Sequence, residues 1–317
     1  MATNKPSILF MGTPAFAVPA LALLLERHYP LLGVLTQPDK PQGRGRSPQP
    51  SPVKVFALAQ HLPLLQPERV RDPAFLRTFR DLAPDLVVLA AYGQLLPGEI
   101  IDQPALGCLN IHPSLLPKYR GAAPINWALI NGETTSGVTI MEMSEELDAG
   151  AIVLQEETPI GPEETCDELH DRLALQGAQL LVRAIEMIAS GTAKPLPQDH
   201  RAATYAPRLK KEDGLIRWDQ DCQTIVNLIR GLSSVPGAYT YLESKKLKIL
   251  RARAEPTLPR EAPGTVVDRP GAAWAVAAGK GYVHLLEVQL ENKKRMATRE
   301  FLRGYRLGPK TVLGVGF

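Results

Sequence analysis

The sequence predicts an α/β protein in which a mostly parallel sheet is followed by a small C-terminal β-barrel. The chain has 317 residues, about twice the length of a typical domain, so two domains are expected. Residues 1–190 alternate short apolar runs with amphipathic segments, whereas the rest of the chain carries short β-rich runs separated by turns. Hydrophobic residues make up 44% and charged residues 22% of the chain. This composition excludes disordered and collagen-like proteins.

The first part of the chain has the pattern of a Rossmann-like, doubly wound sheet. Strand–helix alternation at this spacing favours parallel strands, and near-continuous apolar runs indicate burial on both faces. The expected strands are residues 7–12, 31–36, 62–66, 85–93 and 107–112, with amphipathic segments beginning near residues 17, 51, 73 and 97. Two further strands are expected at 137–143 and 151–160.

A long helix is expected from about Thr165 to Ile188, because apolar residues recur there at helical spacing. Thr165 lies three residues before Glu168, which is the spacing of a capping box. The Gly/Pro-rich stretch that follows predicts a boundary. We therefore expect a first domain at 1–190, a linker at 191–207 and a second domain at 208–317. A helix at 222–232 followed by many short strands predicts an OB-like barrel.

The charge is divided unevenly along the chain. Residues 1–205 contain 16 Lys and Arg against 22 Asp and Glu, a balance of −6, whereas residues 206–317 contain 20 against 11, a balance of +9. Such asymmetry suggests that the second part binds a polyanion, with nucleic acid as the first candidate. The alternative, a basic surface kept for solubility, explains the charge equally well.

The cysteines and the apolar segments bear on the cellular compartment. Cys108, Cys166 and Cys222 are odd in number and lack a Cys-x-x-Cys spacing, so neither a disulfide framework nor a zinc site is suggested, and no metal is expected. The N-terminus resembles neither a signal peptide nor a spanning helix. No later stretch reaches the roughly 18 apolar residues that a spanning helix needs. We expect a cytoplasmic protein that makes no contact with a membrane.

The turn after the first strand argues against a dinucleotide cofactor. A G-x-G-x-x-G motif belongs there, but only Gly12 is present, so nicotinamide and flavin are disfavoured. The connection at 37–46 is long and carries Lys40, Arg44 and Arg46. Because its charge is opposite to that of its own domain, a phosphate-contacting loop is favoured over an idle flexible one.

Asn110 and His112 form the first candidate for chemistry. Residues two apart on a strand share a face, and these two lie at the C-terminal end of their strand, where open parallel sheets bind ligands. An amide N–H and a cationic imidazole together can stabilise an oxyanion. Asp148 offers a carboxylate that favours the charged imidazole, although taken alone it is better explained as a residue that shapes the turn before Gly150.

A longer pattern links these residues. The segments "NIHPSLLPKYRGAAPINWALINGE" and "GVTIMEMSEELDAGAIV" resemble the catalytic region of folate-dependent formyltransferases. The Asn-x-His pair, the S-L-L-P-x-Y-R-G loop and the Leu-Asp-x-Gly turn carry that resemblance, and it covers most of residues 1–190. The segments "MGTPAFAVPAL", "TQPDKPQGRGR" and "NKKRMATREFLRGYRLGPKTVLG" are similar to the members that act on methionyl initiator tRNA. The resemblance implies formyl transfer from 10-formyltetrahydrofolate to the methionyl amine, for use in translation initiation.

The resemblance also implies residue roles. Asn110 and His112 would stabilise the oxyanion, and Asp148 would hold the imidazole and help move the proton. The folate co-substrate would bind between two loops, formed by Ala91, Tyr92 and Gly93 and by Ser114, Leu115, Leu116 and Pro117. The tRNA would contact Lys40, Arg44, Arg46, Lys210 and Lys211. A monomer is expected.

Two alternatives remain open from the sequence. One is a formyltransferase that acts on glycinamide ribonucleotide, an amino sugar nucleotide or water. The other is a non-catalytic RNA-binding protein on an enzyme scaffold. The cationic loop and the basic second domain count against the first, because small acceptors need neither, and the retained Asn110, His112 and Asp148 count against the second.

Overall fold

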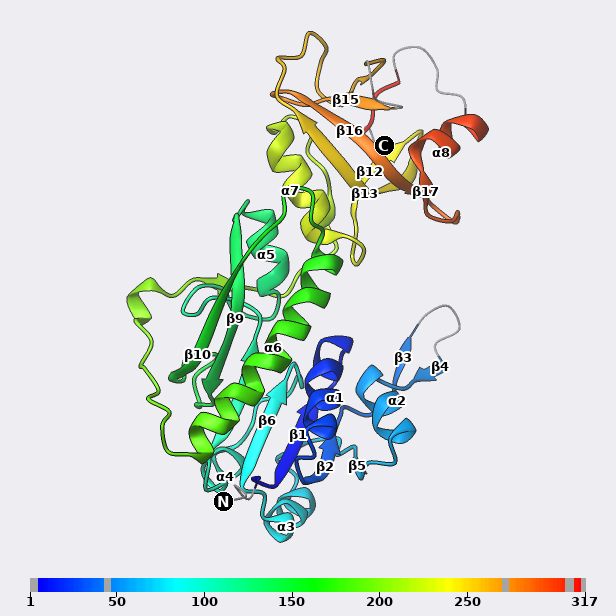
Figure 1. Ribbon diagram of the computed structural model, residues 1–317. Coiled ribbons are helices and arrows are strands. Elements are labelled where there is room, and N and C mark those ends of the chain that lie inside the picture. Colours follow the sequence, from blue (N-terminus) through cyan, green and yellow to red (C-terminus); the bar gives the residue numbers. More distant parts are fainter. Residues whose placement is uncertain (1–4, 43–46, 270–273, 306–310, 315–317) are drawn as a thin grey trace. The chain divides into compact units, whose positions relative to one another are not determined.

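A computed structural model describes residues 5–42, 47–269, 274–305 and 311–314 (Figure 1). The chain divides into two compact units, and each is described by itself. Unit 1 comprises Met1–Gly121, Ser136–Thr158 and His170–Tyr205, and unit 2 comprises Ala122–Thr135, Pro159–Leu169 and Ala206–Phe317. Unit 2 thus takes two segments from the first 190 residues, while the expected division into a catalytic domain, a linker and a tRNA-binding domain stays a prediction.

Unit 1 is built on a seven-stranded sheet in the order β10-β9-β7-β6-β1-β2-β5. The pairs β1/β2, β1/β6, β2/β5 and β6/β7 are parallel, and β7/β9 is antiparallel. The strands are β1 (Ile8–Gly12), β2 (Leu31–Leu35), β5 (Leu64–Leu65), β6 (Leu86–Ala90), β7 (Cys108–His112), β9 (Thr135–Glu142) and β10 (Ile152–Pro159). All five residues of β1 and of β6 are buried. The mostly parallel, Rossmann-like sheet predicted from the sequence is confirmed.

Helices cover both faces of this sheet (Figure 1). They are α1 (Val18–Glu26), α2 (Pro52–Ala59), α3 (Pro73–Leu82), α4 (Gly98–Asp102) and α6 (Cys166–Ala189), with the 3₁₀ turns η1 (Ala15–Ala17) and η2 (His200–Ala202). Pro at the first position and a capping side chain start two of them: Ser51 accepts from Lys54 N, and Asp72 accepts from Ala74 N. The predicted capping box of α6 is present, since the Thr165 amide donates to Glu168 at 2.9 Å.

The two faces pack against different helices. Leu9, Leu89 and Cys108 share one core with α3 and α4. On the other face Gly177 of α6 leaves room for Ile111, because a Cβ there would lie 2.8 Å from the Ile111 side chain. Since side chains alternate along a strand, Asn110 and His112 lie on the same face as Cys108, where they extend past the α3/α4 core to the strand end.

The connection at 37–46 differs from expectation. It was predicted as a loop, but β3 (Lys40–Gln42) and β4 (Ser47–Gln49) form a short antiparallel hairpin. The sequence carries no strand signal there, because Pro41 and Pro48 break the pattern and all the other residues are polar. Two more two-residue strands, β8 (Arg120–Gly121) and β11 (Tyr205–Ala206), lie outside the main sheet.

Unit 2 is a curled antiparallel sheet that forms a half-barrel, in the order β12-β13-β16-β15-β14 with β17 paired to β16. The strands are β12 (Ala238–Leu242), β13 (Lys245–Glu255), β14 (Val266–Val267), β15 (Ala275–Ala277), β16 (Tyr282–Leu290) and β17 (Met296–Ala297). The helices are α5 (Pro124–Ile130), α7 (Cys222–Leu232), α8 (Thr298–Gly304) and the 3₁₀ turn η3 (Glu212–Gly214). The apolar face of α7, including Ile225 and Ile229, packs into the core of this sheet beside Trp274. No helix in the described ranges is both long and apolar enough to cross a membrane.

Candidate active site

Asn110 and His112 lie at the C-terminal end of β7, as the sequence predicts. In the antiparallel register with β9 they face Met141 and Thr139. His112 is buried and Asn110 is half-buried, so the amide can be reached at the edge of the sheet. The strand end therefore presents an amide and an imidazole on one face, which is the arrangement an oxyanion site needs.

Asp148 lies beside His112. Its Oδ2 is 3.7 Å from His112 Nδ1, and both side chains are buried or nearly so. The same oxygen accepts a hydrogen bond from the Gly121 amide at 2.8 Å. Asp148 has φ 48°, in the left-handed region that costs a non-glycine residue about 1–2 kcal/mol. The structure thus brings the three predicted side chains together and holds Asp148 in an unfavourable backbone conformation.

The hydrogen bonds around His112 fix its tautomer. Nε2 lies 2.9 Å from the carbonyl oxygen of Tyr119. A carbonyl oxygen can only accept, so Nε2 carries a proton and donates it. Nδ1 is then the ring atom that faces Asp148.

The loop Ala91–Gly93 follows β6 at the same edge of the sheet. Tyr92 O accepts from Thr13 Oγ1 at 2.9 Å and from Gln37 Nε2 at 3.1 Å, and Gly93 O accepts from the same Gln37 amide at 2.9 Å. A Cβ on Gly93 would lie 2.7 Å from that nitrogen, and its φ is 88°. The Tyr92 hydroxyl is buried without a hydrogen-bond partner among the described residues, and burial raises the pKa of Tyr92 to about 12.

A surface hollow of about 540 Å³ adjoins this loop. Two of its lining residues, Gln94 and Leu95, directly follow Gly93, and two others, Arg69 and Arg71, carry guanidinium groups. Asp72 and Pro73 complete the lining. The hollow is large enough for a small molecule, and its cations suit carboxylates.

The loop Ser114–Pro117 is fixed by two polar side chains of the sheet. Thr139 Oγ1 donates to Ser114 O at 2.6 Å and accepts from the Leu116 amide at 3.2 Å. Gln155 Nε2 donates to Leu116 O at 3.0 Å. Leu115 is half-buried against Gly137, where a Cβ would lie 2.6 Å from its side chain. The backbone of this loop is therefore held in one shape by buried hydrogen bonds.

Two buried residues for which the sequence predicted no role lie next to Asp148. Arg120 is 1% exposed and Gln198 is 6% exposed. Arg120 donates to Gln198 Oε1 from Nε at 3.1 Å and from Nη2 at 2.7 Å. Gln198 lies in the predicted linker, whose Gly/Pro-rich composition gave no sign of a role in the site.

The predicted tRNA-binding residues of unit 1 are only partly described. Lys40 is exposed at the start of β3 and donates to Gln37 Oε1. Gln37 also donates from Nε2 to Gly93 O, so Lys40 is connected through Gln37 to the Ala91–Gly93 loop. Arg44 and Arg46 lie outside the described residues.

Unit 2 carries a basic surface that includes Lys211, which like Lys210 is exposed. On the outer face of β12 and β13, Lys246 Nζ lies 3.4 Å from the centroid of the Tyr239 ring. Tyr239 pairs with Lys248 across the two strands. Burial lowers the pKa of Lys246, and the nearby Lys248 and Lys211 lower it further. Lysines gathered beside an aromatic ring suit a phosphate backbone with unstacked bases.

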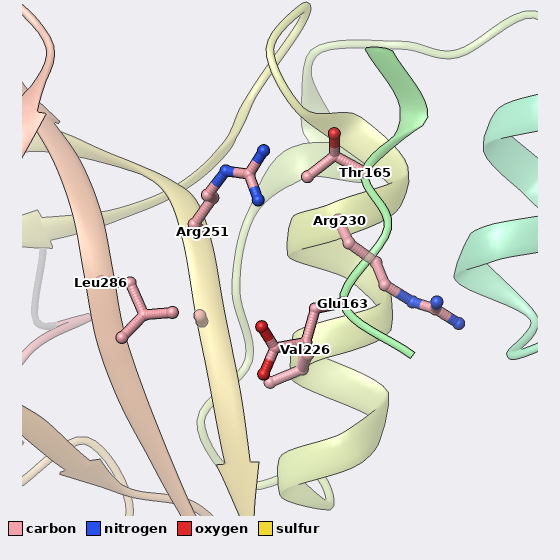
Figure 2. Close-up of a pocket in the computed structure, with 7 residues that line it drawn as sticks. Glu163, Thr165, Val226, Arg230, Arg251 and Leu286 are labelled. Carbon is pink, nitrogen blue, oxygen red and sulfur yellow. The ribbon is translucent and has the colours of Figure 1, made fainter. Parts of the chain in front are cut away.

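A second hollow lies within unit 2 and is too small for a substrate. Its volume is about 10 Å³, and Glu163, Thr165, Val226, Arg230, Arg251, Ala252 and Leu286 line it. Figure 2 shows the Arg251 side chain between Leu286 and Thr165, with Arg230 pointing away from β13. Arg251 forms an ion pair with Glu168. The space admits at most one water molecule, so its role is structural.

Among the residues that the structure describes, no cluster of three or more His, Cys, Asp or Glu side chains is placed to hold a metal ion. Cys108, Cys166 and Cys222 are buried free thiols, and burial raises the pKa of each. Such thiols are poor nucleophiles at neutral pH. The polar groups at the end of β7 and the neighbouring Asp148 are the candidate reactive groups of unit 1.

Comparison with known proteins gives consistent matches over the whole chain. The family described as "Formyl transferase" matches residues 6–185, and "Formyl transferase, C-terminal domain" matches residues 208–306. A methionyl-tRNA formyltransferase from Syntrophus aciditrophicus is 54% identical over 98% of this chain and 99% of its own length. One from Geotalea uraniireducens is 46% identical over 97% of each chain.

Solved structures match the fold. The crystal structure of HypX from Aquifex aeolicus in complex with tetrahydrofolic acid superposes with a TM-score of 0.65 at 20% identity, over 94% of this chain and 47% of that chain. At this identity the likeness concerns the fold alone. It covers both the parallel sheet and the half-barrel, because it spans nearly the whole chain.

Proposed function

This chain belongs to the formyl transferase family, and we propose that it transfers the formyl group of 10-formyltetrahydrofolate to the amino group of methionyl initiator tRNA. The product is N-formylmethionyl-tRNA, which serves translation initiation. The observation that carries this proposal is the near full-length identity to methionyl-tRNA formyltransferases. The grouping of Asn110, His112 and Asp148 at one strand end supports it, since these groups suit acyl transfer to an amine.

The formyl oxygen gains negative charge when the methionyl amine attacks the formyl carbon. Asn110 would donate a side-chain N–H to that oxygen from the rim of the sheet. His112 would add positive charge from the same face. Because its Nε2 proton is already donated to Tyr119 O, the contribution comes from a proton at Nδ1. When the tetrahedral species collapses, the bond to the folate nitrogen breaks.

The proton balance assigns Asp148 its role. The amine loses one proton as its new C–N bond forms, and the leaving folate nitrogen gains one, so no net proton is consumed. Asp148 is a hydrogen-bond acceptor at the correct edge and can pass that proton, directly or through water, with help from His112. General acid–base catalysis of this kind contributes roughly 10²- to 10⁴-fold.

The donor would bind between Ala91–Gly93 and Ser114–Pro117, the two loops at the edge that carries Asn110. Both offer backbone held in place by side-chain hydrogen bonds, from the half-buried Thr13 and Gln37 for one loop and from the buried Thr139 for the other. The hollow that adjoins the first loop at Gln94 and Leu95 carries Arg69 and Arg71, which suit the carboxylate tail of such a donor. The residues present therefore fit a folate.

Both units would contact the phosphate groups of the tRNA. Lys40, together with Arg44 and Arg46, would approach the acceptor end beside the donor loops. Lys210 and Lys211 would hold the stem from residues 206–317, the part of the chain with the charge balance of +9. We further propose that the protein acts as a cytoplasmic monomer.

Labelled formyl transfer tests the acceptor. Incubated with 10-formyltetrahydrofolate, the protein should label charged initiator tRNA and leave glycinamide ribonucleotide, an amino sugar nucleotide and water unlabelled. Transfer to a small acceptor in preference to the tRNA would refute the proposal. Absence of transfer to every acceptor would instead favour a non-catalytic RNA-binding protein.

A further inference from the structure

We infer that Arg120 and Gln198 are positioning residues that hold Asp148 against His112, through a clamp on the backbone of the Asp148–Gly150 turn. This inference rests on the proposed function, since it concerns the same reaction. We give neither residue a direct contact with substrate, because the hydrogen bonds of both side chains go to each other and to the backbone of Asp148 and Gly150. They act through Asp148.

The clamp begins with a buried cation. The Arg120 guanidinium donates twice to Gln198 Oε1, which leaves that amide oxygen fully engaged. Its remaining nitrogen, Nη1, lies 3.7 Å from Glu146 Oε1. A guanidinium in this position fixes the orientation of the Gln198 amide, because the reversed amide would place N–H groups against N–H groups.

The fixed amide then binds the turn. Gln198 Nε2 donates to Asp148 O at 2.9 Å and to Gly150 O at 2.8 Å, so both of its protons are used. The adjacent segment is anchored as well, because Leu196 exchanges two backbone hydrogen bonds with Ile152 at 2.8 and 2.9 Å. The turn carries the left-handed Asp148 and would relax without such restraint.

The contacts close a ring around the reactive carboxylate. Asp148 binds Gly121 N through its side chain, and its backbone oxygen is bound by Gln198, which in turn is held by Arg120. Arg120 and Gly121 are neighbours in the sequence. Both ends of Asp148 are therefore tied to one short segment, and the carboxylate cannot rotate away from His112 without breaking the ring.

Gln198→Glu is the sharpest test, because it keeps an oxygen for Arg120 and replaces the donating amide by a second oxygen that faces two carbonyls. We expect the single-turnover rate of formyl transfer to fall by about 10- to 100-fold, since a misplacement of about 1 Å can cost about 10²-fold. The KM values for folate and tRNA should stay within about twofold. Gln176→Glu is the control, because Gln176 Nε2 also donates to two oxygens, the backbone and side-chain oxygens of Glu156 on β10, and the change should leave the rate unchanged.

Combination with Asp148→Ala separates positioning from a general structural role. If the clamp acts only through Asp148, adding Gln198→Glu to Asp148→Ala should cost less than about twofold. An equal loss in both backgrounds would overturn the inference, and so would a folded Gln198→Glu with normal turnover. If Gln198→Glu does not fold, Arg120→Met/Gln198→Met removes the buried charge together with its partner and is read in the same way. Failure of the proposed function looks different, because the wild-type protein itself would then transfer no formyl group to methionyl initiator tRNA.

Discussion

Gly150→Ala tests whether the position of Asp148 limits the reaction. A Cβ on Gly150 would lie 1.9 Å from the carbonyl oxygen of Glu142, whereas real Cβ atoms stay beyond 3.0 Å. The backbone of Gly150 and that of Glu142 must therefore move apart by about 1.1 Å, the difference between those two distances. Because Gly150 is two residues from Asp148, that shift reaches the reactive carboxylate.

We expect Gly150→Ala to lower kcat by about 10²-fold, which is the effect of a misplacement of about 1 Å. The overpacked turn should also lower the free energy of unfolding by about 1–3 kcal/mol. Single-turnover formyl transfer and urea unfolding measure the two effects. Gly304→Ala is the control, because no atom of the described residues beyond its own chain neighbours and its own helix lies within 4 Å of a Cβ there, and Ala favours a helix. A Gly150→Ala protein with wild-type kcat would refute the positional argument.

Three further predictions concern other parts of the chain. The pKa of Glu168 is lowered from 4.5 to about 2, and the hydrogen bond from the Thr165 amide is the largest cause. The stabilisation of the folded protein by ionised Glu168 is therefore complete above about pH 4.5 and is lost as the pH falls towards 2. Glu168→Gln should lower Tm at pH 7 and match wild type near pH 2, and a Tm difference that persists there would contradict this. Lys210→Ala/Lys211→Ala should weaken tRNA binding and reduce the salt slope of log Kd by up to about 2, whereas an unchanged slope would exclude phosphate contacts. Tyr92→Phe should leave the unfolding free energy of the ligand-free protein unchanged or up to about 1 kcal/mol higher, because the hydroxyl is buried unpaired, and a clear loss in urea unfolding would contradict that.

The parts of the fold that the sequence predicted are those set by local patterns. The helices at 166–189 and 222–232 follow from apolar periodicity and capping residues within each segment. The strands follow from apolar runs, with ends within a few residues of those observed. The β3/β4 hairpin was missed because its two strands are stabilised by pairing with each other, and Pro41 and Pro48 hide the strand pattern.

The residues of the candidate site also differ in how far local sequence patterns predict them. The shared face of Asn110 and His112 follows from the two-residue period of a strand, so the sequence was enough. Asp148 is distant in the sequence, and its place beside His112 was expected from the family resemblance. The Arg120–Gln198 pair joins residues 78 positions apart, and no local pattern predicts such a contact. The roles of these residues in catalysis stay proposals.

The chemical step in Asn110→Ala tests the central claim most directly. Asn110 is half-buried at the strand end, so its loss removes an oxyanion donor and leaves the core intact. Single-turnover formyl transfer to methionyl initiator tRNA should fall by about 10²- to 10³-fold. Folate and tRNA affinity should remain near wild type, because the donor acts in the transition state. A near-normal rate in a folded Asn110→Ala protein would contradict the account and place the reaction elsewhere.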